Sequence, residues 1–194
     1  MMKKIFFLIL AILIIVSGWY FFSMKNKQTE LEKVKLDHPN LESYVDGVTK
    51  AQTDFDQNKD EINNYVMLGL AWKSLADWSQ KEGVENYKDY YREALKVYEM
   101  GIEKTKRKNT LLMTNAANME KYLGEYKLAE EYYKEAISVS QGDESYYVYL
   151  AELYEYQLGK SKEEILAIYD EGLKWVINKN WLESEKESYL ERNK

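Results

Sequence analysis

Apolar residues recur at intervals of three and four from Leu41 onward. The first such stretch places apolar or small side chains at Leu41, Tyr44, Val45, Val48, Ala51 and Phe55. Because this spacing puts side chains on one side of an α-helix, it predicts an amphipathic helix over residues 41–57. Similar stripes recur almost to the end of the chain. With only 9 glycines and 1 proline to interrupt them, they favour an all-α fold built of long helices.

A pattern of large and small residues repeats within these stripes. A large residue is followed three positions later by an aliphatic or small residue, and the next position is again small. Three positions after that, most copies have another large residue. The three copies are Tyr65-Leu68-Gly69-Trp72, Met113-Ala116-Ala117-Glu120 and Tyr147-Leu150-Ala151-Tyr154. The second and third copies start 34 residues apart. The substitution of Glu120 for a large residue predicts weaker packing in the second copy.

A second pattern follows each copy of the first. It combines a small or aliphatic residue, a tyrosine four positions on, and a small residue three positions further, at Ala94-Tyr98-Gly101, Ala129-Tyr133-Ala136 and Ile165-Tyr169-Gly172. Small residues let a neighbouring helix approach closely, and a large residue one turn away fills the adjacent groove. A single helical pair cannot bury such a stripe, so the pairs are expected to stack.

This combination resembles the tetratricopeptide repeat (TPR), a helix–turn–helix of 34 residues. The best match is residues 123–136, LGEYKLAEEYYKEA, which has the Gly-x-Tyr turn at Gly124 and Tyr126 and the small–Tyr–small pattern of the second helix. The resemblance covers about residues 60–176 and implies an α-α superhelix. The chain departs from the pattern at Ile165, at Gln141 where a proline is common, and by about two extra residues around Gly159.

The largest departure lies in the first repeat, where about thirteen extra residues, 77–89, separate the two halves. The apolar stripes continue into this insertion, which predicts two lengthened helices with a turn near Gly83. The extra hairpin is expected to project by roughly 10 Å, at 1.5 Å per helical residue. We therefore divide the helical domain, residues 41–194, into three repeats and a C-terminal cap. Their ranges are 62–104, 110–141, 144–177 and 180–192.

The N-terminal segment differs from the rest of the chain. Residues 1–4 form a short basic tail, and residues 5–24 contain no charged side chain. Twenty uncharged residues in a helix span about one bilayer core, which predicts a transmembrane signal anchor. A signal peptide cleaved near Val16-Ser17-Gly18 and a buried helix are the alternatives. A polar stalk is expected over residues 25–40, with Pro39 ending any helix. The basic tail favours a soluble domain outside the cytoplasm of a single-pass membrane protein.

Charge and residue types exclude several function classes. The segment after the apolar run has 25 basic and 33 acidic residues, which disfavours nucleic acid as a partner. The chain has no cysteine, and its one histidine, His38, lies in the expected stalk. Residues 54–60 resemble the start of a calcium loop, but Lys59 and Tyr65 replace the required Gly and Glu. We expect Asn58 or Asp60 to cap the following helix instead.

No phosphate loop, HExxH motif or nucleophile elbow is present. We therefore predict no enzyme, no catalytic or metal site and no cofactor. In proteins with the resembled repeat, the first helices line a concave groove that binds a partner. The residues expected on that face are Asn63, Val66, Leu70, Lys73, Leu111, Thr114, Asn115, Asn118, Lys121, Tyr122, Ser145, Val148, Tyr149, Glu152 and Tyr156.

Some members of the family grip a terminal carboxylate with basic residues on this face. Here Thr114 and Tyr149 stand where basic residues would help, so we do not predict that clamp. The leading hypothesis is a membrane-tethered scaffold that binds a partner peptide or protein. A self-assembling structural envelope protein, which would form homo-oligomers, is the main alternative. A secretion-associated chaperone-like accessory and an enzyme are further alternatives.

Overall fold

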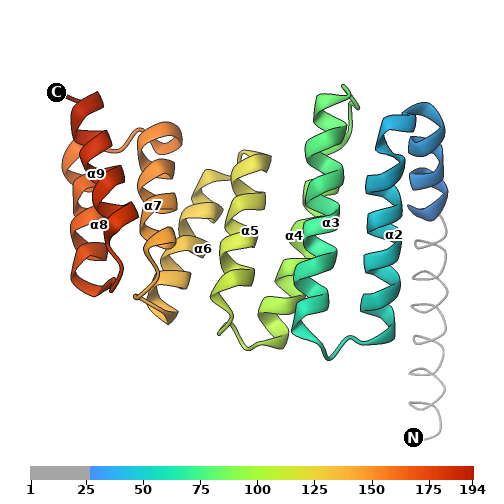
Figure 1. Cartoon of the computed structure of the whole chain (residues 1–194), viewed down its shortest axis with the longest axis horizontal. Coiled ribbons are helices and arrows are strands. Elements are labelled where there is room, and N and C mark those ends of the chain that lie inside the picture. Colours follow the sequence, from blue (N-terminus) through green and yellow to red (C-terminus); the bar gives the residue numbers. More distant parts are fainter. Residues whose placement is uncertain (1–26) are drawn as a thin grey trace, which may run out of the picture.

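A computed structural model describes residues 27–194, and every regular element in this range is helical (Figure 1). Residues 27–37 form a helix. It is followed by η1 (Pro39–Leu41), α2 (Glu42–Gln57), α3 (Ile62–Lys81), α4 (Tyr87–Lys104), α5 (Thr110–Leu123), α6 (Tyr126–Val139), α7 (Glu144–Leu153), η2 (Tyr154–Leu158), α8 (Lys162–Trp175) and α9 (Asn180–Arg192).

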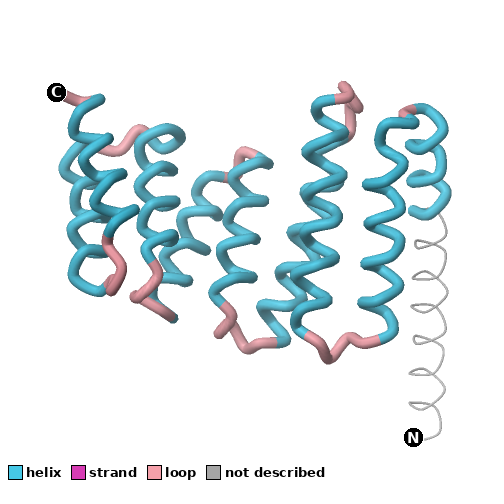
Figure 2. The backbone as a smooth tube through the Cα atoms, viewed as in Figure 1, coloured by secondary structure: helices cyan, strands magenta, loops and turns pink. Residues whose placement is uncertain are grey.

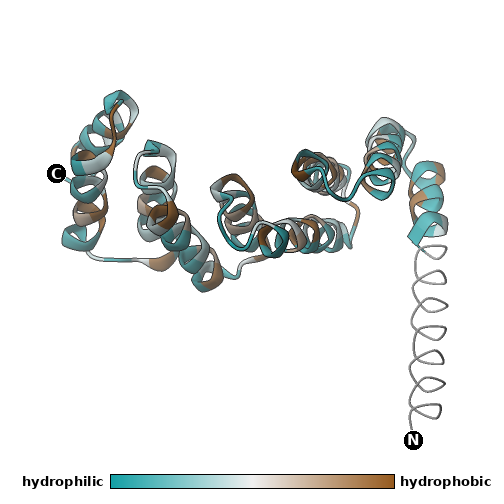
Figure 3. Ribbon diagram, turned by 90° about the horizontal axis from the view of Figure 1, so that it is seen from below, coloured by the Kyte–Doolittle hydropathy of each residue, from teal (hydrophilic) through white to brown (hydrophobic). Residues whose placement is uncertain are grey.

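Successive helices run antiparallel and pack mainly against their neighbours in the chain. Short loops join them at the two edges of the row (Figure 2). The row bends between its N-terminal and C-terminal ends, so that it has an inner and an outer side (Figure 3). This is the stacked arrangement expected of helical hairpins that cannot bury their apolar stripes alone.

The large and small positions of the sequence interlock between helices. A Cβ atom added to Gly69 on α3 would lie 2.2 Å from the ring of Tyr98 on α4. One added to Gly172 on α8 would lie 2.7 Å from the ring of Tyr147 on α7. Both tyrosines are almost fully buried. The absence of a side chain at each glycine therefore sets how closely the two helices approach.

The first hairpin is the longest. Helices α3 and α4 contain 20 and 18 residues, whereas α5 and α6 contain 14 each. The turn between α3 and α4 includes Gly83, with a φ of +74° that favours glycine. The added turns of α3 contact α2, where Tyr44 stacks on Trp78 with ring centroids 5.1 Å apart. The insertion thus enlarges the contact with the N-terminal helices.

The polar segment expected to be a stalk is instead packed in its described part. The helix over residues 27–37 buries Leu31 in the main core. Lys27 forms an ion pair with Glu93 and lies 5.2 Å from the centre of the Trp72 ring. The high polarity of the segment favoured a stalk, but Leu31 and Val34, three positions apart, both pack against the core. The helix does end before Pro39, as expected.

The basic tail (1–4) and the signal anchor (5–24) lie outside the described residues. Within residues 27–194, no helix has the length and apolar character needed to cross a membrane.

Two local expectations meet different outcomes. The cap before α3 is Glu61, whose side chain makes no capping hydrogen bond, so the expected capping by Asn58 or Asp60 is wrong. Asn58 instead ends α2, and its side-chain oxygen accepts from the backbone N–H of Asp60 at 3.3 Å. The extra residues near Gly159 are accommodated by the π-helical turn η2, which widens the end of α7.

Candidate functional site

Helices α3, α4 and α5 bring together a cluster of aromatic and basic side chains centred on Tyr122. This residue lies near the C-terminal end of α5 and is 40% exposed. Its ring stacks on Tyr91 of α4, with centroids 5.1 Å apart. The Tyr91 hydroxyl donates to Asp77 Oδ1 of α3 at 2.6 Å. Because Tyr91 is buried and hydrogen-bonded, it forms a fixed support for the exposed Tyr122 ring.

Two lysines flank the same ring. The ammonium groups of Lys73 and Lys121 lie 5.3 Å and 5.8 Å from the Tyr122 ring centre. Lys73 also forms an ion pair with Asp77 at 2.6 Å. Lys121 makes no ion pair with any residue in the range 27–194, although it lies near Glu152. Burial raises the pKa of Glu152, and Lys121 acts in the opposite direction.

A second aromatic group continues from this cluster toward the C-terminal end. Tyr149 of α7 contacts Tyr133 of α6 at 6.0 Å and Trp181 of α9 at 5.9 Å between ring centres. The Tyr133 hydroxyl donates to Asn118 Oδ1 at 2.8 Å. Burial raises the pKa of Tyr133, and the neighbouring Tyr122 and Tyr149 hydroxyls add to this rise. We call Tyr91, Tyr122, Tyr133, Tyr149 and Trp181 the aromatic row.

Eleven of the fifteen groove residues expected from the sequence fall into three groups. The first group lies together at or beside the aromatic row and consists of Lys73, Lys121, Tyr122, Tyr149 and Glu152. The second group makes contacts inside the domain. Thr114 is buried, and its hydroxyl donates a hydrogen bond to the carbonyl of Thr110 at 2.8 Å. Asn118 accepts a hydrogen bond from the Tyr133 hydroxyl, and Val148 is fully buried. Contrary to expectation, these three are not free contact groups, because helical spacing alone does not separate the inner surface from the layer beneath it.

The third group lies elsewhere. Tyr156 lies on η2 with the Arg192 guanidinium 6.0 Å from its ring centre, at the C-terminal end of the row of helices. Asn115 is half-buried on α5. Leu70 lines a pocket between α2 and α3 rather than the aromatic row. Helical spacing did not predict Asp77, Tyr91 or Trp181 as part of the site, because the ring contacts of Tyr91 and Trp181 only emerge in three dimensions.

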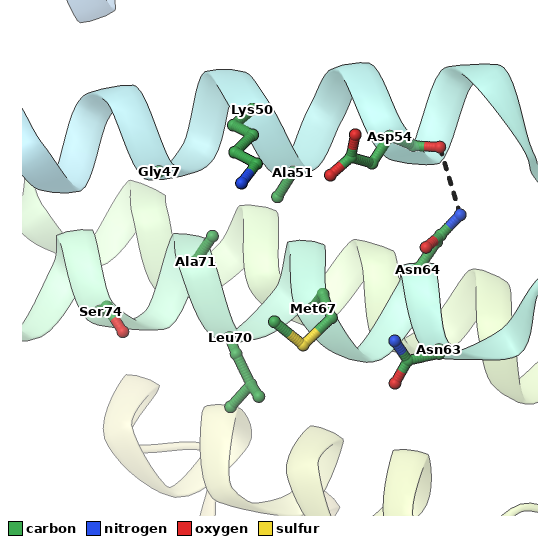
Figure 4. Close-up of a pocket in the computed structure, with 10 residues that line it drawn as sticks. All are labelled: Gly47, Lys50, Ala51, Asp54, Asn63, Asn64, Met67, Leu70, Ala71 and Ser74. Atoms are coloured by element: carbon green, nitrogen blue, oxygen red, sulfur yellow. Dashed lines mark hydrogen bonds between the residues drawn. The ribbon is translucent and has the colours of Figure 1, made fainter.

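The pocket between α2 and α3 has a volume of about 440 Å³ (Figure 4). Its wall from α2 carries Lys50 and Asp54, and its wall from α3 carries Met67, Leu70 and Asn63. Met67 is 52% exposed. The repeated pattern begins on α3 and does not extend to α2, so it predicts no pocket at this junction.

Two buried carboxylates, Glu120 and Glu130, are not part of the aromatic row. Burial of Glu130 would raise its pKa, but hydrogen bonds from Lys134, Tyr154 and Lys127 bring it down to about 2. Burial of Glu120, aided by Glu99 and Glu125, raises its pKa to about 7. Glu120 is 5% exposed and fills a core position expected to be large and apolar. Within residues 27–194, no group of three or more His, Cys, Asp or Glu side chains is arranged to hold a metal ion.

Comparisons with known proteins identify the fold. No family model matches the sequence, and no curated protein matches it. Among solved structures, the chain is similar to TTC0263, a thermophilic TPR protein of Thermus thermophilus, with a TM-score of 0.63 and 21% identity over 90% of this chain and 94% of that one. It is also similar to the MamA protein, with a TM-score of 0.55 and 17% identity over 86% of this chain and 79% of that one. The fold is therefore an all-α helical repeat of the TPR type.

Proposed function

We propose that this protein is a membrane-tethered scaffold that binds a segment of a partner protein on its inner surface. The observation that carries the proposal is the aromatic row with its two flanking lysines. Tyrosine and tryptophan rings at a surface provide rigid contact area with little side-chain entropy to lose on binding. Here Tyr122 is exposed, and Tyr149 and Trp181 are half-buried. The neighbouring TPR-type structures support a role in protein–protein interaction through this fold.

The electrostatics of the surface add to this argument. Lys121 is a cation without an ion-pair partner among the described residues, and Glu152 is a partly buried carboxylate near it. A partner segment that supplies a hydrogen-bond acceptor to Lys121 gains an interaction without breaking an existing salt bridge. Lys73, by contrast, already binds Asp77. We therefore assign Lys121, Tyr122 and Tyr149 as the main contact residues.

The membrane tether is proposed from the sequence of residues 5–24, which are uncharged and long enough to span a bilayer core. The short basic tail supports a helical domain on the side away from the cytoplasm. Tethering would raise the local concentration of the scaffold near membrane-bound partners without any additional contact.

The binding proposal is tested by capture of partners from native membranes. The variant Lys121→Ala/Tyr122→Ala/Tyr149→Ala removes the proposed contact side chains, and Tyr156→Ala is the matched control outside the aromatic row. We expect the triple variant to lose at least about tenfold of the captured partner, about 1.4 kcal/mol of binding free energy. Recovery equal to that of the wild-type chain would contradict the proposal. Asn118 is left intact because its loss would remove the partner of the buried Tyr133 hydroxyl.

The tether is tested by membrane fractionation. Leu10→Asp/Leu13→Asp places two charges in the apolar run, each costing about 2.5–3.5 kcal/mol in a bilayer core. We expect the wild-type chain in the membrane pellet after carbonate washing and the variant in the supernatant. A wild-type chain that is found in the supernatant would contradict the tether, whereas the binding surface is judged by the capture experiment alone.

A further inference from the structure

The two edges of the row of helices differ in charge. One edge consists of the loops that follow α2, α4, α6 and α8 (Figure 2). They hold five basic and three acidic residues and span residues 58–61, 105–109, 140–143 and 176–179. The loops of the opposite edge hold one basic and three acidic residues and span residues 38, 82–86, 124–125 and 159–161. We call the first of these the basic edge.

The loop after α4 presents two lysines on a strained backbone. Lys106 and Arg107 have φ of +53° and +55°, a left-handed conformation that favours glycine. The Arg107 guanidinium holds the loop through ion pairs with Glu135 of α6 and Glu103 of α4. Lys106 and Lys108, on either side of it, are exposed and make no ion pair with any residue in the range 27–194. The loop is therefore fixed in a form that leaves two ammonium groups without an anionic partner.

The loop after α8 exposes apolar side chains at the same edge. Ile177 is 94% exposed, although its neighbour Val176 is almost fully buried and fixes the loop to the core. Trp175, the last residue of α8, is exposed, and its indole N–H donates to Glu171 Oε1 at 2.8 Å. A single exposed apolar side chain is ordinary. An isoleucine this exposed, close to a tryptophan on a basic edge, is the combination that suits the headgroup layer of a membrane.

The described chain also starts from the side of the basic edge. Helices alternate in direction along the row, and α2 ends at the basic edge (Figure 1). The helix over residues 27–37 runs opposite to α2, so Lys27 is at its end nearer the basic edge. A tether that precedes Lys27 therefore reaches the domain from this side and brings the basic edge, rather than the opposite one, toward the bilayer.

We propose that the basic edge lies on the surface of an anionic phospholipid bilayer. Ile177 and Trp175 lie at the level of the headgroups, and Lys106 and Lys108 bind lipid phosphates. This inference rests on the proposed tether and adds the orientation of the domain at the membrane. The helices are then roughly perpendicular to the bilayer, and the inner side of the row stays open to a partner.

A lipid surface fits the spread of these groups better than a protein partner does. The lysines follow α4 and the apolar pair follows α8, with three helices between them. A flat, extended surface contacts both places without a matching shape, and it supplies the anionic groups and the apolar layer together. The groups that favour this contact are absent from the opposite edge, whose loops are mainly acidic.

The overall charge of the chain shows how the tether and the edge act together. The formal net charge is −6 at pH 7, so an anionic bilayer repels the domain at long range. A tether keeps the domain close to the surface, where charges within a Debye length of about 8 Å dominate the interaction. At that distance the basic edge determines which side of the domain contacts the lipid.

The test places a fluorescent label on the edge of the full chain. Because the chain has no cysteine, Ile177→Cys carries a single environment-sensitive nitrobenzoxadiazole label. Leu36→Cys is the matched control, since Leu36 is also an exposed apolar residue but lies near the opposite edge. Each chain is reconstituted in vesicles of phosphatidylcholine alone and of equal parts phosphatidylcholine and phosphatidylglycerol. Both leaflets have the same composition, so the direction of insertion does not affect the result.

We expect the label at position 177 to emit at least about twofold more strongly in the anionic vesicles than in the neutral ones. The label at position 36 should show no difference. Lys106→Glu/Lys108→Glu should abolish the difference at position 177, Lys106→Arg/Lys108→Arg should retain it, and about 0.5 M salt should reduce it by screening. Circular dichroism establishes that each variant is folded.

Equal emission from position 177 in the two vesicle types, or the same increase at position 36, would overturn the inference. An increase at position 177 that occurs in native membranes but not in vesicles of pure lipid would also overturn it and assign the edge to a protein partner. The carbonate wash judges the tether separately. A chain that stays in the pellet without the difference at position 177 shows that the tether is right and the edge is wrong. A chain that carbonate extracts removes the tether, and the edge then stands only if the difference between the vesicle types remains.

Discussion

At the scale of single residues, the fold depends on pairs in which a glycine accommodates a tyrosine ring from the next helix. Gly69 with Tyr98 and Gly172 with Tyr147 are the tightest pairs. Gly47 on α2 is different, since a Cβ atom added there meets no atom within 4 Å. A side chain added at Gly69 would therefore clash with its neighbour, whereas one added at Gly47 would not.

We predict that Gly69→Ala destabilises the domain by about 1–3 kcal/mol, because the added methyl group overlaps a fully buried ring. Gly47→Ala should stabilise it by about 0.5–1 kcal/mol, because alanine loses less backbone entropy than glycine in a helix. Urea unfolding followed by circular dichroism measures both changes. A similar change in the two variants would contradict the interlocking of Gly69 with Tyr98.

The buried carboxylate of Glu120 makes stability depend on pH. Its pKa in the folded state is about 7, above the value of about 4.3 in an unfolded chain. Between these values the folded state binds the proton and the unfolded state does not, so stability falls as pH rises through this window. Glu99 and Glu125 are the acidic groups that raise the pKa further, after burial.

We predict that Glu120→Gln stabilises the domain by about 1–3 kcal/mol at pH 7.5 and by much less at pH 5. The amide keeps the shape of the protonated acid but does not ionise. The free energy of unfolding of both chains at the two pH values provides the measurement. A variant whose stability relative to wild type is the same at pH 5 and pH 7.5 would show that Glu120 does not titrate in this window.

At the scale of elements, the repeated pattern made the helical hairpins predictable, because Ala94, Tyr98 and Gly101 contact the adjacent helix through one face. The lengthened first hairpin also followed from its apolar stripes. The packing of residues 27–37 did not, because this mostly polar segment meets the core through two apolar side chains, Leu31 and Val34, which are too few to stand out as a stripe. For the candidate site, the resemblance implied a groove face with Tyr122 and Tyr149, but it did not separate them from Thr114 or Val148, which are buried. That distinction depends on how deeply neighbouring helices cover each turn.

The junction between η2 and α8 depends on a defined cap. Ser161 accepts a hydrogen bond from the backbone N–H of Glu164, and the Glu164 side chain accepts one from the Ser161 N–H. Ser161→Ala should therefore cost about 1 kcal/mol. Ser184→Ala, at an exposed position inside α9, is the control and should change stability by less than about 0.5 kcal/mol. Equal unfolding midpoints for wild type and Ser161→Ala would argue against this capping role.

At the scale of the whole molecule, the buried apolar residues form two clusters that meet near α5 and α6. The aromatic row crosses this meeting point, with Tyr91 in the first cluster and Tyr133 in the second. The aromatic row is therefore fixed by packing from both halves. A partner bound along Tyr122 and Tyr149 would contact both halves and should protect α5 and α7 from hydrogen exchange together.

The most direct test of the account is site-specific photo-crosslinking in native membranes. A benzophenone amino acid replaces either Tyr149 on the inner surface or Leu128, which is 43% exposed on α6. We predict a discrete cross-linked partner from position 149, which disappears when Lys121→Ala and Tyr122→Ala are added, and no such product from position 128. The same products from both positions, or a product from position 128 alone, would contradict partner binding on the inner surface.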